Sequence, residues 1–161
     1  MDSCGKVWEN YLKWGKTHML TGEYKHTIDT KKRLSLPVKF RKELGKEVIV
    51  TKGIDKCLVV YSQKEGEAMF SKLGELPESK LEARSFARIR LAGAAEVRSD
   101  GLGRILIPDH LKKYAGLKKN VTVCGLYNRL EIWDENIWEV YKKGIEKKVV
   151  GLVSKLEDLG I

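Results

Sequence analysis

The sequence predicts an α+β fold made of two tandem β-β-α-β-β units, with helices after each unit. The main observation is an internal repeat, because residues 29–37 return as residues 100–108 and a basic run follows each copy. A second observation is that residues 58–61 are echoed by residues 130–133. Self-similarity of this length indicates a tandem duplication. Three residues are identical in the two copies, Asp29, Arg33 and Pro37 in the first and Asp100, Arg104 and Pro108 in the second.

The first unit begins with alternating polar and apolar residues, the pattern of a half-buried strand. A polar turn at residues 29–32 leads into a return strand, and Pro37 suits the first position of a short helix that Gly45 ends. Two runs rich in β-branched residues follow, separated by a hairpin signal at residues 53–56. The predicted order of strand, strand, helix, strand and strand falls on residues 23–28, 33–36, 37–44, 48–51 and 57–61.

The second unit repeats this order, with Pro108 opening the short helix and Gly116 ending it. Its predicted elements are residues 94–98, 104–107, 108–116, 121–124 and 130–133. Helical segments follow both units, at residues 63–76, at residues 78–91, and from Asp134, a predicted N-cap, onward. Gly144 and Gly151 predict that this last helix is divided into two pieces.

The repeat also divides the chain into segments. Residues 1–18 have no counterpart in the second half and are predicted to be an extension, disordered or not native. The predicted segments after them are a first domain at residues 19–76, a linker helix at 77–93 and a second domain at 94–161.

Composition and charge narrow the classes of partner that the protein could bind. The chain has 161 residues, 31 of them basic and 22 acidic, so its formal charge is +9. Such a balance favours polyanionic partners, nucleic acid first and an anionic membrane surface second. No apolar stretch approaches 18 residues, so a membrane-spanning segment is not predicted. The three cysteines form no Cys-x-x-Cys pair, and Cys57 and Cys124 are interpreted as small hydrophobic residues.

The repeated motif does not resemble a hydrolytic site, since it holds one carboxylate and one guanidinium without an activated nucleophile. Asp29 and Asp100 are predicted to structure their turns by accepting backbone N–H groups, and Gly103 to supply a positive φ. Each motif arginine then either forks to a phosphate or a guanine edge, or pairs with the aspartate and holds the turn. Neither a metal site, a cofactor nor an enzymatic activity is predicted.

The first copy carries more positive charge than the second, because residues 29–42 hold six basic residues against one acid. The second copy, over residues 100–113, holds three basic residues against two acids. The first copy is therefore expected to bind phosphates more strongly than the second copy. The predicted DNA-binding residues are Lys31, Lys32, Arg33, Lys39, Arg41, Lys42 and Arg104.

Residues 19–159 resemble the MraZ family of bacterial transcriptional regulators, built from two tandem SpoVT/AbrB swapped-hairpin domains. The resemblance rests on the paired motifs, the strand ends at Tyr61 and Trp133, and the segments 130–134 and 83–94. It implies AbrB-like units that interleave into one pseudo-symmetric barrel. The motif residues it carries over are Asp29, Lys31, Arg33, Asp100, Gly103 and Arg104. One departure is Lys32, where the family usually has Gly, so this turn either changes its backbone or gains a phosphate contact.

The resemblance implies a ring-like homo-oligomer that binds double-stranded DNA at promoter repeats, in the cytoplasm and at the nucleoid. It implies repression of the protein's own cell-division and cell-wall operon. The alternative is an antitoxin-like interaction module of the same fold, whose helical tail neutralises a protein partner.

Overall fold

The computed structural model describes residues 19–160, so the predicted extension at residues 1–18 lies outside the described residues. The fold is α+β, as predicted, and the strand-strand-helix-strand-strand order is found in both halves. The strands are β1 (Leu20–Thr27), β2 (Arg33–Ser35), β3 (Glu47–Lys52), β4 (Leu58–Ser62), β5 (Ala95–Arg98), β6 (Arg104–Leu106), β7 (Asn120–Tyr127) and β8 (Leu130–Asp134). The helices are α2 (Val38–Leu44), α3 (Gln63–Gly74), α4 (Leu81–Ala87), α5 (Asp109–Tyr114), α6 (Glu135–Glu146) and α7 (Val149–Lys155), with a π-helical turn η1 (Arg88–Ala92) and a 3-10 turn η2 (Glu157–Leu159).

The two halves exchange strands. Six strands form one antiparallel sheet in the order β1-β7-β8-β4-β3-β5, and β2 pairs with β6 in a separate two-stranded ribbon. The first strand of each half therefore pairs with the other half, β1 with β7 and β5 with β3. The pairings leave β1 and β5 as edges of the larger sheet, so the described strands do not form the closed barrel that the resemblance implies.

Equivalent positions of the repeat face each other across the molecule. Leu34 pairs with Ile105 in the ribbon, and Val59 pairs with Glu131 in the sheet. Antiparallel pairing of equivalent residues is what a two-fold rotation between the halves produces. The duplication is therefore folded as one pseudo-symmetric body, in which the two halves share their strand pairing.

The main hydrophobic core lies between the ribbon and the sheet, and two smaller clusters pack the sheet against α3 and α6. The main core contains equivalent side chains from both halves that are fully shielded from solvent, and Tyr24 packs edge-on against Phe40 with ring centroids 5.2 Å apart. Each half alone would leave a strand unpaired and part of this core open, since small units bury little apolar surface. Core residues contributed by both halves include Leu34, Phe40, Val50, Ile105, Leu111 and Val123.

The short helices after each return strand lie where the prolines predict. Pro37 precedes α2 and Pro108 precedes α5, with φ of −52° and −58° that already fit a helix start. Helix α2 ends at Gly45, whose φ is 76°. Each helix turns an apolar side chain into the core, Phe40 from α2 and Leu111 from α5. The same sequence signals therefore place equivalent helices beneath the ribbon.

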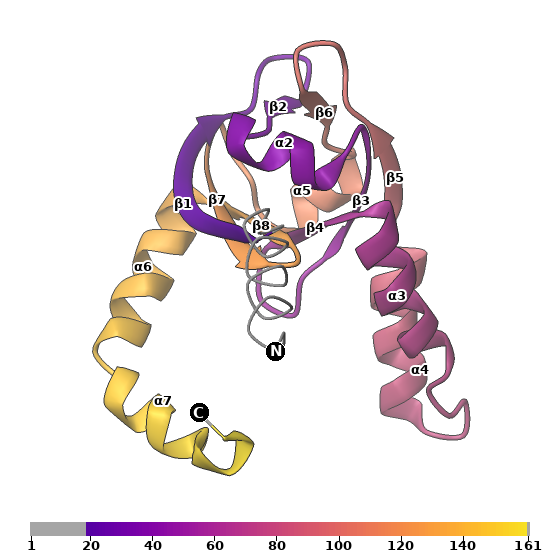
Figure 1. Ribbon diagram of the computed structural model, residues 1–161, viewed down its shortest axis with the longest axis vertical. Helices are drawn as coiled ribbons and strands as arrows, with labels where there is room; N and C mark the ends of the chain where they lie inside the picture. The colour runs from indigo at the N-terminus through magenta and orange to yellow at the C-terminus, as the bar shows by residue number, and fades with distance from the viewer. Residues whose placement is uncertain (1–18, 161) are drawn as a thin grey trace, which may run out of the picture.

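Two helical arms run away from the ribbon end of the molecule, α3 with α4 and α6 with α7 (Figure 1). The last helix is divided, as predicted, but the break falls at residues 147–148, while Gly144 and Gly151 lie inside α6 and α7. Helix α6 is anchored where Tyr141 stacks on Trp133, with ring centroids 4.9 Å apart. Neither arm covers the ribbon, where α2 and α5 are the nearest helices (Figure 1).

Cys57 and Cys124 are buried and free, which confirms that they serve as small hydrophobic residues. Burial raises the pKa of both thiols, to about 12 for Cys124. They are therefore neutral packing groups at ordinary pH.

Candidate nucleic-acid interface

The first Asp–Arg turn is held by one carboxylate. Asp29 Oδ1 accepts hydrogen bonds from the backbone N–H groups of Lys31 and Arg33, both at 2.9 Å. Its Oδ2 accepts from Arg33 Nε at 2.8 Å. One aspartate thus satisfies two backbone donors and fixes the arginine that starts β2.

The second turn repeats this geometry. Asp100 Oδ1 accepts from the backbone N–H groups of Leu102 and Arg104 at 2.9 and 3.0 Å, and its Oδ2 accepts from Arg104 Nε at 2.7 Å. The predicted turn-structuring role of Asp29 and Asp100 is present in these contacts. Of the two roles considered for the arginines, the ion pair is formed in both copies.

The ion pairs leave most N–H donors of the two arginines available. Each pair is made through Nε, whereas a guanidinium carries four further N–H donors on its terminal nitrogens. The side chains remain 30% exposed at Arg33 and 26% at Arg104. Backbone hydrogen bonds and the arginine hold the pKa of Asp29 and of Asp100 below the ordinary value. Both aspartates are therefore ionised near neutral pH and orient an arginine whose outer edge can still bind.

Lys32 does not change the turn. Its φ is 63°, in the left-handed region that Gly103 occupies with 73°. The backbone hydrogen bonds are also equivalent, from Lys32 N to Asp29 O and from Gly103 N to Asp100 O, both 3.0 Å. A lysine here accepts a backbone cost of order 1 kcal/mol relative to glycine. The Gly-to-Lys departure thus adds a charge without altering the turn.

Two of the predicted DNA-binding residues of the first half contact residues of the second half. Lys32 Nζ lies 2.6 Å from Asp109 Oδ1 at the start of α5. Arg41 donates from Nε to the Leu36 carbonyl at 2.8 Å, and its guanidinium covers Gly103 so closely that a Cβ there would overlap it. A larger residue at position 103 would have to adopt the positive φ that Lys32 adopts and would displace the flexible Arg41 side chain. The two motifs form one surface and not two separate patches.

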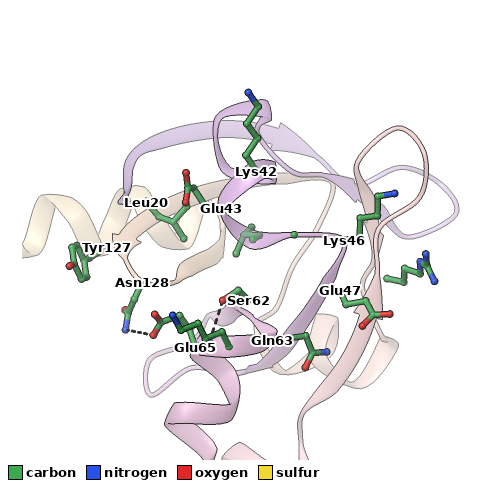
Figure 2. A pocket seen from close by; sticks show the side chains of 14 residues that line it. Leu20, Lys42, Glu43, Lys46, Glu47, Ser62, Gln63, Glu65, Tyr127 and Asn128 are labelled. Carbon is green, nitrogen blue, oxygen red and sulfur yellow. Dashed lines mark hydrogen bonds between the residues drawn. The ribbon is translucent and has the colours of Figure 1, made fainter. Parts of the chain in front are cut away.

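The remaining predicted cations are three lysines. Lys31 is exposed in the first turn, and Lys39 Nζ lies 3.5 Å from the Thr21 carbonyl. Lys42, on α2, lies at the rim of a pocket of about 640 Å³ and points away from it (Figure 2). Among the described residues, none of the three forms an ion pair with an acid within 4.0 Å. They are the predicted residues whose charge is least neutralised.

The pocket beside α2 is not itself a polyanion site. Its lining mixes both signs of charge, and Glu65 accepts a hydrogen bond from Asn128 at 3.4 Å at one side of it (Figure 2). A phosphate placed there would meet carboxylates as well as ammonium groups. The charged residues of the lining are Lys42, Glu43, Lys46, Glu47, Lys64, Glu65 and Arg98.

The ribbon gathers the functional candidates at one end of the molecule (Figure 1). Arg33 and Arg104 start its two strands, and the turns and α2 surround it. The sequence motifs did not single out two other residues here, Asp109, which pairs with Lys32, and Leu106, which is 53% exposed. At both positions one copy of the repeat has a polar residue and the other an apolar one. A position-by-position comparison of the two copies could therefore have identified them from the sequence.

Residues 19–160 contain no group of three His, Cys, Asp or Glu side chains placed to hold a metal ion. Within the same residues, no helix combines the length and apolar character that crossing a membrane requires.

Comparison with known proteins agrees with the repeat. A model of the MraZ protein family, whose description suggests an antitoxin-like protein, matches residues 19–89 and 91–150. Proteins named transcriptional regulator MraZ are similar over 143 residues, which is 89% of this chain and the whole of each relative. The identity is 48% in Caldicellulosiruptor bescii, 45% in Caldanaerobacter subterraneus and 44% in Acetivibrio thermocellus. The chain therefore belongs to the MraZ family.

Proposed function

We propose that this protein is a sequence-specific DNA-binding transcriptional regulator, and that it represses its own cell-division and cell-wall operon. The observation that carries the proposal is the uncovered ribbon, on which two aspartate-held arginines sit within a cationic surface. Arginine forks suit both phosphate and the guanine edge. A two-stranded ribbon has the dimensions that the major groove admits. The relatives' name, transcriptional regulator, supports the same reading.

Within this proposal, the predicted cations divide by role. Arg33 and Arg104 are oriented by carboxylates, so they are suited to read bases. Lys31, Lys39 and Lys42 lack such partners and are suited to phosphates. Lys32 and Arg41 join the two halves of the surface and contribute their charge to it.

The proposal extends to assembly and location. A ring-like homo-oligomer would place several ribbons on repeated promoter sites, and linked modules gain effective concentration on such DNA. We propose the cytoplasm and the nucleoid as its location and no catalytic role. The strand exchange is consistent with swapped-hairpin units, and residues 19–76, 77–93 and 94–161 are retained as proposed first domain, linker and second domain.

Salt dependence tests the phosphate contacts. Three lysine contacts predict that affinity for the DNA upstream of its own gene falls about fortyfold between 50 and 200 mM salt for each subunit that binds. Fluorescence anisotropy with labelled upstream DNA measures this. A variant with Lys31, Lys39 and Lys42 all changed to alanine should show a much flatter profile. A flat profile in the unchanged protein would contradict phosphate binding.

A second candidate function is neutralisation of a protein partner. The observation in its favour is the second helical arm, where α7 exposes an apolar face, with Val150 78% and Val153 49% exposed. Stable co-purification of one small protein with the tagged chain, lost when α7 is deleted, would favour this function over DNA binding.

A further inference from the structure

The ribbon has an inner and an outer face. Successive strand side chains point to opposite sides, and Leu34 and Ile105 are fully buried. Their neighbours along the strands therefore project outward. Two cross-strand pairs make up this outer face, Arg33 with Leu106 and Ser35 with Arg104.

The outer face breaks the pseudo-symmetry at one position. Leu106 occupies the place in the second copy that Ser35 occupies in the first. It is 53% exposed, although the ribbon residues Leu34 and Ile105 beside it are fully buried. Side chains directly opposite in an antiparallel pair have Cβ atoms about 5 Å apart. An exposed leucine thus stands beside the aspartate-held Arg33, while Arg104 has a serine beside it.

The surroundings of Leu106 point to a DNA partner. Arg33 lies directly across the ribbon from it, and the carbonyl of Lys32 accepts a hydrogen bond from the N–H of the next residue, Ile107. A polyanion complements these two cations. On DNA, the apolar group that a side chain can meet in the major groove is the C5-methyl of thymine. The arginine beside it would contact a guanine edge, so the pair would span two neighbouring bases.

We propose that Leu106 is a specificity-determining residue that packs on a thymine methyl next to the base contacted by Arg33. This inference rests on the proposed DNA-binding function and adds the chemical group, a thymine methyl, that one end of the ribbon recognises. The Arg33–Leu106 end selects for a thymine, whereas the Arg104–Ser35 pair puts no apolar side chain on the outer face of the ribbon. The pseudo-symmetric ribbon therefore reads an asymmetric sequence and fixes the orientation of each subunit on DNA.

Thymine-to-deoxyuridine replacement tests this directly, because it removes only the methyl group. Each thymine of the upstream repeats is replaced in turn, in every repeat, and affinity is measured with the full chain. At one thymine position the loss should be at least about fourfold, the equivalent of exposing one methyl-sized apolar group. Leu106→Ser, which copies the residue of the first unit, should bind thymine and deoxyuridine DNA equally at that position.

The matched control is Leu81→Ser. Leu81 is 59% exposed and lies on α4, in the arm that points away from the ribbon (Figure 1). This variant should keep the full methyl effect. Binding without any methyl-sensitive thymine, or a methyl effect that persists in Leu106→Ser, would overturn the inference and leave DNA binding intact. Failure of the unchanged protein to prefer its upstream DNA would overturn both.

Discussion

Replacing Arg33 with alanine is expected to weaken binding to the upstream repeats by about tenfold to a hundredfold. A well-placed arginine fork contributes about 1–3 kcal/mol of base discrimination. Asp29 already holds this side chain through Nε, so little ordering entropy is lost on binding. Titration of labelled upstream DNA with each variant measures the loss.

The same substitution at Arg104 is expected to cost less. Arg33 has the exposed Lys31 in its turn and Leu106 across the ribbon, whereas the equivalent neighbours of Arg104 are Leu102 and Ser35. Arg33→Lys is the matched control, because it keeps the charge and removes the fork. It should fall between the unchanged protein and Arg33→Ala. Equal losses for Arg33→Ala and Arg104→Ala would contradict the predicted asymmetry.

Replacing Ile105 with alanine is expected to lower the free energy of unfolding by about 2–5 kcal/mol. Ile105 is fully buried where it pairs with its repeat equivalent Leu34, so the cavity opens in the core that both halves share. That loss is a large part of the 5–15 kcal/mol typical of a domain. Urea unfolding followed by circular dichroism measures it.

The control is the neighbouring Leu106→Ala, which removes an exposed side chain and should change stability by less than about 0.5 kcal/mol. Because the strands are exchanged, Ile105→Ala should shift one cooperative transition. Two separate transitions, with only one of them shifted, would contradict a shared core.

Local structure could be read from the sequence because its causes are local. Pro37 and Pro108 begin the short helices, and Asp29 and Asp100 shape turns that depend on residues at most four positions away. Comparing the copies also predicted the duplicated order of elements. These features need only backbone preferences and short hydrogen bonds.

The exchange of strands could not be read this way. Alternation in residues 23–28 predicts which side of the first strand is buried, but it does not say whether β1 pairs within its own half or with β7. The closed barrel came from the family resemblance, whereas β1 and β5 remain as edges of the sheet. Pairing partners depend on the tertiary structure as a whole.

Charge was the least reliable guide to location. Arg90, on the π-helical turn, counts toward the positive charge of the chain, but it is only 7% exposed. It donates to the Lys52 carbonyl at 2.6 Å and to the Tyr61 hydroxyl at 3.4 Å, while its guanidinium lies 5.6 Å from the Phe86 ring centroid. The excess of basic residues in the first motif is likewise reduced by the fold, because Lys32 forms an ion pair with Asp109 of the second half.

The most direct test of the account is a gel shift of the purified full-length protein on the DNA upstream of its own gene, with the repeats intact or scrambled as competitor. Sequence-specific binding predicts that intact repeats compete at concentrations at least a hundredfold lower than scrambled DNA of equal length and composition. Equal competition by the two DNAs, or no shift at low salt, would contradict the central claim.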